Sequence, residues 1–239
     1  MFQISQGRPV LKRSNVFSII TNILEPVSYF IYLTAFVYRY FYTRKTSHLL
    51  PVAYYFIASI MMTYASVLAD RWMGNLFLYN YFLLPAGIIF FAGYFMDIFL
   101  KQYRKVVWIL FTLNGLLFVF KIAFIPRQEV FDSIGFATLS ISVLVFCFMY
   151  FRQLLNEVSE KPIFGNFNFW VVCSFFISYS GSFLVFLTYY YLTEKISTDY
   201  VDKTRHLLTV LWGIPNVLLF ISGIFTLTGA IWTNYRRKS

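Results

Sequence analysis

The sequence predicts an all-α membrane protein, a bundle of seven transmembrane helices, and two observations predict it. Hydrophobic residues make up 59% of the 239 residues, whereas charged residues make up only 13%, about half of the share that is usual in a soluble domain. The charged residues also cluster along the chain. This clustering leaves seven apolar runs, each close to the roughly 20 residues that a helix needs to cross a bilayer.

The seven expected spans cover nearly the whole chain. They are residues 16–41, 49–69, 76–100, 106–125, 134–155, 167–192 and 207–232. Because lipid offers no hydrogen-bond partners to the backbone, each span must be helical. The runs lack the alternation of membrane β-strands and are too long for them. Residues 1–239 are therefore expected to form a single transmembrane domain.

The first span contains Glu25-Pro26, which leaves two structures open. Ser18, Thr21, Asn22 and Glu25 follow the spacing i, i+3, i+4, i+7 and form one polar helical stripe. Proline is well tolerated in the first turn of a helix, so a short interfacial helix could precede a span that starts at Pro26. Alternatively, one long kinked helix turns the stripe toward the bundle interior. We favour the first structure, because it leaves the carboxylate of Glu25 at the membrane surface.

The Lys and Arg residues of the loops and tails predict the orientation. With seven spans, the side that holds the N-terminus carries eight of these residues, and the opposite side carries eleven, including Arg236-Arg237-Lys238. This bias places the N-terminus outside and the C-terminus in the cytoplasm. Although the formal net charge is +10, the bases occupy short loops and tails, so we expect a lipid bilayer and no nucleic acid as partner.

Ionisable groups within a span are candidates for function. Glu25 and Lys121 fall at the same side of the membrane, and we predict that they pair, lining an outward-facing cavity. The alternative for Lys121 is snorkelling to the nearby interface. Asn114 precedes Lys121 by seven residues and shares its helix face, so it is a further candidate for the polar interior.

Small residues recur on the sixth span. Ser174, Ser178 and Ser182 are spaced by four residues, and Gly181 lies beside them. Such a small-xxx-small surface lets two helices approach closely. We therefore predict that Ser174 and Gly181, with Gly223 of the last span, serve helix packing.

A ligand pocket between the last two spans is the alternative to simple packing. Ser178 and Ser182 of the sixth span and Asn216 of the seventh would line it. Asn216 follows Pro215, which should kink the last helix and free a backbone carbonyl.

The sequence shows no catalytic constellation. Its two histidines, His48 and His206, both lie at loop edges, so an intramembrane metal hydrolase would lack its ligands. No phosphate loop or Glu-x-x-His motif is present. We therefore expect no catalytic residues, no metal and no cofactor, and do not expect an enzyme.

Aromatic and small residues of the last two spans carry a resemblance. Phe169-Trp170, the run Tyr179–Phe183, and Leu211-Trp212 with Asn216 resemble a family of small, uncharacterised bacterial seven-helix membrane proteins. Such proteins look like the membrane sensor half of a signalling system without the attached kinase. The resemblance implies a receptor-like or accessory signalling role, and it assigns no functional residues.

These observations lead to two functional hypotheses. The first is a non-enzymatic sensor or accessory signalling subunit of the bacterial inner membrane, which binds a small or lipidic ligand and acts through a cytoplasmic-domain signalling protein. The second is a transporter or a homo-oligomeric pore. The second hypothesis predicts a solute flux that substitutions of Lys121 or Glu25 abolish.

Overall fold

The fold is known from a computed structural model that describes residues 16–67, 77–124, 131–156, 162–195 and 201–235. Helices cover nearly all of these described residues, and none of them is in a strand, so the all-α prediction is confirmed. The basic N-terminal tail, Arg236-Arg237-Lys238 and the side chains of Ser18, Thr21 and Asn22 lie outside the described residues.

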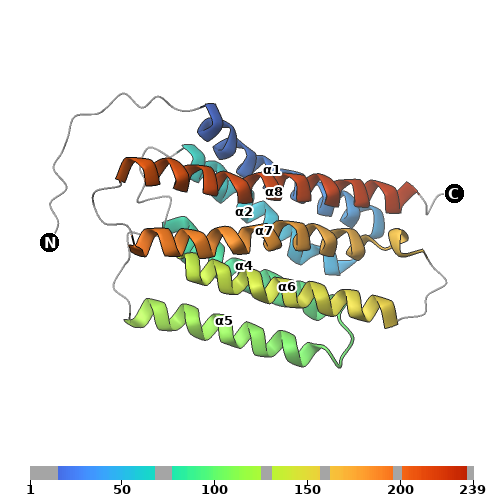
Figure 1. The fold of residues 1–239 in the computed structure, drawn as a ribbon. Coiled ribbons are helices and arrows are strands. Elements are labelled where there is room, and N and C mark those ends of the chain that lie inside the picture. Colours follow the sequence, from blue (N-terminus) through green and yellow to red (C-terminus); the bar gives the residue numbers. More distant parts are fainter. Residues whose placement is uncertain (1–15, 68–76, 125–130, 157–161, 196–200, 236–239) are drawn as a thin grey trace.

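Seven long helices make up the described chain (Figure 1). They are α1 (Val16–Thr43), α2 (Leu49–Val67), α4 (Leu84–Ile98), α5 (Arg104–Phe124), α6 (Ser133–Asn156), α7 (Phe167–Lys195) and α8 (Val201–Tyr235). A π-helical segment, η2 (Tyr79–Leu83), leads directly into α4. Short 3-10 turns, η1 (Thr46–His48) and η3 (Ile163–Gly165), precede α2 and α7.

Six of the seven helices are long and apolar enough to cross a membrane, namely α2, the joined η2 and α4, α5, α6, α7 and α8. The chain is therefore an integral, multi-pass membrane protein. The seventh helix, α1, is 28 residues long, which corresponds to about 42 Å at 1.5 Å per residue. Its length suffices for a span, but it contains Glu25 and Arg39 and is not among the six helices that are both long and apolar enough.

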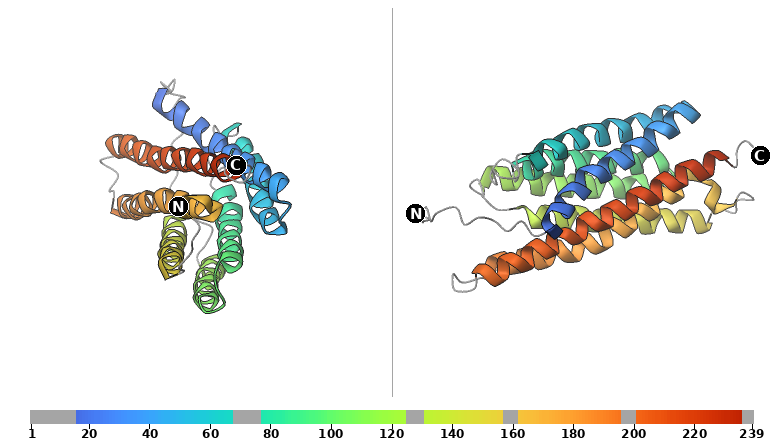
Figure 2. Two further views of the ribbon diagram at one scale, coloured as in Figure 1. Left: turned by 90° about the vertical axis from the view of Figure 1, so that its right-hand side faces the viewer. Right: turned by 90° about the horizontal axis from the view of Figure 1, so that it is seen from above.

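Six helices, α1 among them, form a closed ring, and α5 lies outside it (Figure 2). Around the ring, α1 contacts α2, α2 contacts α4, α4 contacts α6, and α6, α7 and α8 follow in order back to α1. The remaining helix, α5, packs against α4 and α6 from outside. Only Val107 and Asn114 of its residues are buried.

Aromatic rings fill the centre of the ring of helices. The rings of Tyr32 and Tyr55 stack with their centroids 4.7 Å apart. Phe90 and Phe175 lie at 6.1 Å and nearly at right angles. Such offset-stacked and edge-to-face pairs stabilise a core beyond the area that they bury. The centre of a single copy is therefore packed with side chains.

The structure corrects our preferred interpretation of the first span. Pro26 lies inside a continuous α1 that runs from Val16 to Thr43, so the chain forms one long helix instead of a separate interfacial helix. Glu25 is only 9% exposed and is buried against neighbouring helices. The packing of α1 against its neighbours outweighs the preference of proline for a first turn. Pro215 likewise lies within a continuous α8.

Small residues bring α7, α8 and α1 close together. The Thr226 hydroxyl of α8 donates a 2.7 Å hydrogen bond to the Ser174 hydroxyl of α7. Gly181 of α7 lies against Leu218 of α8, and Gly223 lies against Ile31 of α1. Ser174, Gly181 and Gly223 thus occupy helix–helix contacts, where the small-residue pattern places them.

Candidate functional site

A buried carboxylate anchors a polar network near one end of the bundle. Glu25 of α1 accepts a 2.5 Å hydrogen bond from the hydroxyl of Tyr79, and both side chains are buried. Tyr79 is the first residue of η2, whose π-helical turn is wider than an α-helical one. Such π-helical turns are rare and are frequent at functional sites. From this turn the side chain of Tyr79 reaches Glu25 of α1.

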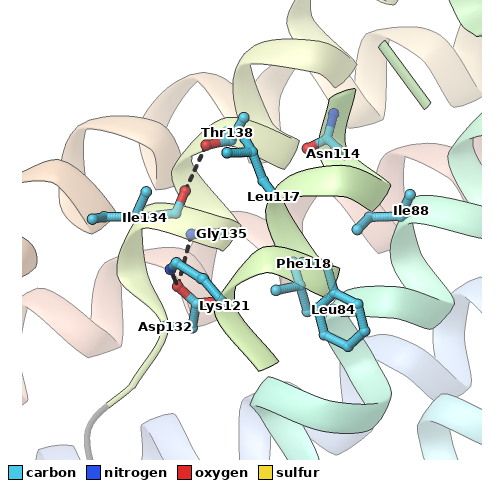
Figure 3. A pocket seen from close by; sticks show the side chains of 10 residues that line it. All are labelled: Leu84, Ile88, Asn114, Leu117, Phe118, Lys121, Asp132, Ile134, Gly135 and Thr138. Atoms are coloured by element: carbon cyan, nitrogen blue, oxygen red, sulfur yellow. Dashed lines mark hydrogen bonds and ion pairs between the residues drawn. The ribbon is translucent and has the colours of Figure 1, made fainter. Parts of the chain in front are cut away.

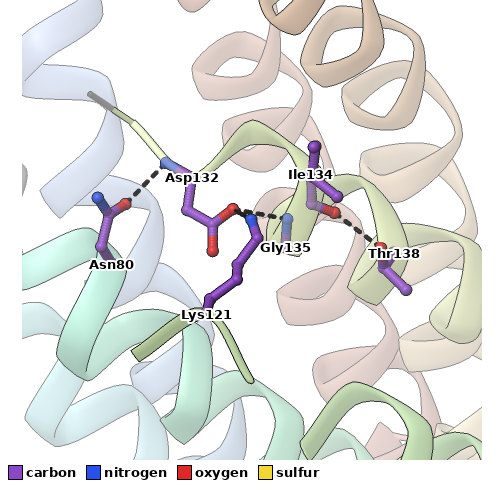
Figure 4. A network of polar contacts seen from close by, with 6 residues as sticks. All are labelled: Asn80, Lys121, Asp132, Ile134, Gly135 and Thr138. Carbon is purple, nitrogen blue, oxygen red and sulfur yellow. Dashed lines mark hydrogen bonds and ion pairs between the residues drawn. The ribbon is translucent and has the colours of Figure 1, made fainter. Parts of the chain in front are cut away.

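Asn80, the residue after Tyr79, extends the network toward α5 and α6 (Figure 4). The side-chain oxygen of Asn80 accepts a 2.9 Å hydrogen bond from the backbone N–H of Asp132. The Asp132 carboxylate forms an ion pair with Lys121 of α5 and accepts a 2.9 Å hydrogen bond from the N–H of Gly135. Asp132 therefore caps the N-terminus of α6 and holds α5 at the same time. We call Glu25, Tyr79, Asn80, Lys121 and Asp132 the Glu25–Asp132 network.

The predicted pairing of Glu25 with Lys121 is wrong. Glu25 is hydrogen-bonded to Tyr79, and Lys121 is paired with Asp132. The two residues lie toward the same end of the bundle, as expected, but α1 belongs to the ring and α5 packs outside it on α4 and α6. The η2 segment connects them, since Tyr79 and Asn80 are adjacent in the chain.

An aromatic cluster extends the network to α7 and α8. The Trp212 ring of α8 lies 5.6 Å from the ring of Tyr79 and 4.7 Å from that of Phe131. Tyr189 of α7 lies 6.1 Å from Trp212 and 5.7 Å from Phe131. Phe131 directly precedes Asp132. A displacement of Asp132 would therefore move Phe131 and change its ring contacts with α7 and α8, as well as the ion pair with α5.

A narrow hollow opens beside the ion pair, between α4, α5 and α6 (Figure 3). Its walls are mainly apolar, and its lining is formed by Leu84, Ile88, Asn114, Leu117, Phe118, Lys121, Asp132, Ile134, Gly135 and Thr138. Lys121 and Asp132 close one end, with side chains 24% and 14% exposed. Asn114 is buried and donates 2.8 Å hydrogen bonds to the Leu110 carbonyl and to the Ser142 hydroxyl of α6. Two polar contacts thus hold α5 to the start and the middle of α6.

The remaining polar candidates do not line this hollow. Ser178, Ser182 and Asn216 are buried in α7 and α8, away from the residues that line it. Of the predicted interior residues, the structure brings Asn114 and Lys121 together at one hollow, and it places Glu25 in the same network through η2.

Tyr79 and Asp132 of the network were not among the candidates predicted from the sequence. Tyr79 is one of 19 tyrosines, and nothing in its local sequence distinguishes it. Asp132 lies just before the apolar run that begins at Ile134, where an aspartate is a favoured helix N-cap. That position was the one available signal, and it predicts the capping of α6 but not the ion pair with Lys121.

A second polar cluster lies near the opposite end of α1. The guanidinium group of Arg39 is buried and donates hydrogen bonds to the Thr233 hydroxyl, at 3.3 Å, and to the Asn234 side chain. It also lies 5.3 Å from the centre of the Phe167 ring. This cluster fastens the ends of α1, α7 and α8 to one another.

Within the described part of the chain, no three His, Cys, Asp or Glu side chains gather as a metal site would require. No family model, no curated protein and no solved structure matches the chain.

Proposed function

We propose that the protein is a non-enzymatic membrane sensor or accessory signalling subunit. It binds a small or lipidic ligand near the Glu25–Asp132 network and acts through a cytoplasmic-domain partner. The single observation that carries this proposal is that η2 joins two polar contacts, Tyr79 with Glu25 and Asn80 with Asp132. A ligand that moves α5 or the start of α6 would therefore also move α1.

Contacts near the two ends of α1 offer a path by which a movement caused by the ligand would reach α8. Glu25 and Arg39 are 14 positions apart in one continuous helix, which corresponds to about 21 Å along its axis. At the far end, Arg39 is hydrogen-bonded to Thr233 and Asn234 of α8. A shift of α1 at the network would reach the end of α8 through this cluster, since packed helices move as units.

In this proposal all seven helices span a bacterial inner membrane, with the N-terminus outside and the C-terminus in the cytoplasm. The Glu25–Asp132 network then faces the exterior, and the Arg39 cluster lies near the cytoplasmic surface, where a partner would dock. The resemblance to kinase-free sensor domains agrees with this arrangement. The aromatic packing at the centre of the helix ring favours this function over a pore through one copy, although a homo-oligomer could still enclose one.

A pull-down of the tagged full-length chain from native membranes in mild detergent tests the proposal. We expect a stoichiometric partner with a cytoplasmic domain, identified by mass spectrometry. Tyr79→Phe, which removes the hydrogen bond to Glu25, should change the output of that partner while the complex persists. Tyr64→Phe is the matched control, because Tyr64 is 58% exposed on α2. A homogeneous homo-oligomer without a partner, which conducts solutes in liposomes, would contradict the sensor proposal.

A further inference from the structure

Glu25 carries a carboxyl group that lies buried among apolar helices. The residue is only 9% exposed, and its carboxylate accepts a hydrogen bond from the Tyr79 hydroxyl. Among the described residues Glu25 forms no ion pair, since the one that they contain joins Lys121 to Asp132. Burial of an ionised carboxylate without a cation costs more free energy than one neutral hydroxyl group returns. The neutral acid therefore suits this site better than the carboxylate does.

In their described parts, the elements packed around Glu25 bring no cation to it. Helix α1 lies against α8 and α2, and the described side chains of these two helices, residues 207, 210–235 and 49–67, include no charged group and only tyrosines that could titrate. In η2 and α4 the one charged residue is Asp97, near the far end. Tyr79 and Tyr29 are the titratable groups beside Glu25 on η2 and α1. The charged or titratable side chains that follow α2 or begin α8 lie outside the described residues, and they are Asp70, Arg71, Asp202, Lys203, Arg205 and His206.

Pro26 provides a second reason for a protonated Glu25. Helix α1 continues through Pro26, which has no N–H to bond the backbone carbonyl of Asn22. Helix side chains lean toward the N-terminus, so the carboxyl group of Glu25 lies over the preceding turn, on the side of this carbonyl. A protonated carboxyl group can donate a hydrogen bond there, whereas a carboxylate only accepts. The proline directly after Glu25 therefore favours the acid.

Glu25 lies near one end of the bundle, because its partner Tyr79 is the first residue of the apolar span Tyr79–Ile98. We propose that Glu25 is a proton-binding site, in which a proton from the water at this end binds one carboxyl oxygen while the other accepts the hydrogen bond from Tyr79. Loss of the proton leaves a buried charge and weakens the packing of α1 against α2 and α8. The inference stands apart from the sensor function, since a transporter can use the same site.

The pH dependence of thermal unfolding tests the proton site in the purified full-length chain. In the unfolded chain Glu25 is ionised above about pH 5, whereas the folded chain keeps its proton. The folded state thus binds about one proton more than the unfolded state, so the free energy of unfolding falls as the pH rises. We expect the melting temperature to fall between about pH 5 and about pH 8. Glu25→Gln, which is neutral at every pH and similar in shape to the acid, should remove this fall.

Two matched variants assign the effect to Glu25. Asp97→Asn makes the same change at an exposed carboxylate of α4, and His206→Gln removes the histidine near the start of α8. Both should keep the fall in melting temperature. A fall of unchanged size in Glu25→Gln, or its loss in either control instead, would overturn the proposal.

Infrared difference spectra between acid and alkaline samples give a second readout, the carbonyl stretch of a protonated carboxyl group. The wild type should still show this band at about pH 6, where an exposed glutamate is almost fully ionised. Tyr79→Phe should shift the band to higher frequency, because a hydrogen bond to a carbonyl oxygen weakens the C=O bond. Tyr64→Phe, which alters an exposed tyrosine of α2, should leave it in place. Absence of the band, or a band that Tyr79→Phe does not shift, would overturn the proposal even if Glu25→Gln failed to fold.

Neither measurement involves a partner protein. A chain that shows the protonated Glu25 but yields no partner in the pull-down would keep the proton site and contradict the sensor function. A chain with a partner but without a protonated Glu25 would do the reverse.

Discussion

The helices α8 and α5 are both long and apolar, but they are attached to the bundle in different ways. Helix α8 packs closely between α1 and α7 through small residues, and Gly229 lies against the Trp170 ring of α7. Helix α5 is bound to α6 by the Asn114–Ser142 hydrogen bond and the Lys121–Asp132 ion pair, with a hollow between them. Helix α8 is thus held by close approach to two neighbouring helices, whereas α5 is held to α6 by two localised polar contacts.

The largest effect is expected where α7 and α8 meet. A Cβ atom added at Gly229 would collide with the Cβ and Cγ atoms of Trp170, which are too near the backbone to move away. Gly229→Ala should therefore destabilise the protein by about 1–3 kcal/mol, as overpacking of a tight core does. Thermal unfolding in detergent measures this change. An unchanged melting temperature would show that the contact between α7 and α8 is looser than described.

Removal of the Arg39 hydrogen bonds should have an effect of similar size. Arg39→Gln keeps a polar side chain but shortens it away from Thr233 and Asn234. Loss of charge-assisted hydrogen bonds should cost about 1.5–3 kcal/mol of unfolding free energy. Arg44→Gln is the control, since Arg44 is exposed beyond the end of α1. Equal melting temperatures of the two variants would contradict a structural role for the cluster.

The Asn114–Ser142 hydrogen bond between α5 and α6 should contribute less to the free energy of unfolding. A double-mutant cycle of Asn114→Leu and Ser142→Ala, which removes the 2.8 Å hydrogen bond, should give a coupling of about 0.6 kcal/mol, the average for such bonds in membranes. Coupling above about 2 kcal/mol would exceed the range known for such bonds. It would show that α5 is fixed as firmly as the ring helices.

The smallest effect should be a gain in stability on α5. A Cβ atom at Gly115 would meet nothing within 4 Å. Gly115→Ala should therefore stabilise the protein by up to about 1 kcal/mol, because alanine loses less backbone entropy in a helix. The same Gly→Ala substitution is thus expected to stabilise α5 and to destabilise α8 at Gly229. A fall in melting temperature would mean that α5 has a tight neighbour on this side.

Helix positions could be predicted well because bilayer physics acts on the sequence locally. The described helices follow the expected segments, and α6 covers Ser133–Asn156 where 134–155 was predicted. Glu25-Pro26 misled the prediction, because a proline compatible with a helix start lies in mid-helix when neighbouring helices support it. The small residues Ser174 and Gly181 lie at helix contacts, because close approach needs small side chains.

Lateral neighbours could not be predicted in the same way. Hydropathy indicates how deep a residue lies, but not where its helix stands around the bundle. Glu25 and Lys121 were therefore matched by depth alone, while their partners Tyr79 and Asp132 are set by the order of helices in the ring. One partner is a tyrosine among many, and the other lies just outside the predicted span.

The π-helical turn at Tyr79–Leu83 has a consequence for the phase of the helix that contains it. A π-helical turn holds about one residue more than an α-helical turn, so converting η2 to ordinary α-helix with all of its residues in place would rotate Tyr79 and Asn80 relative to α4. Tyr79 would leave Glu25 and Asn80 would leave Asp132 in the same step, because both contacts depend on a single angular setting. The two contacts are therefore expected to be lost together when the geometry of this one turn changes.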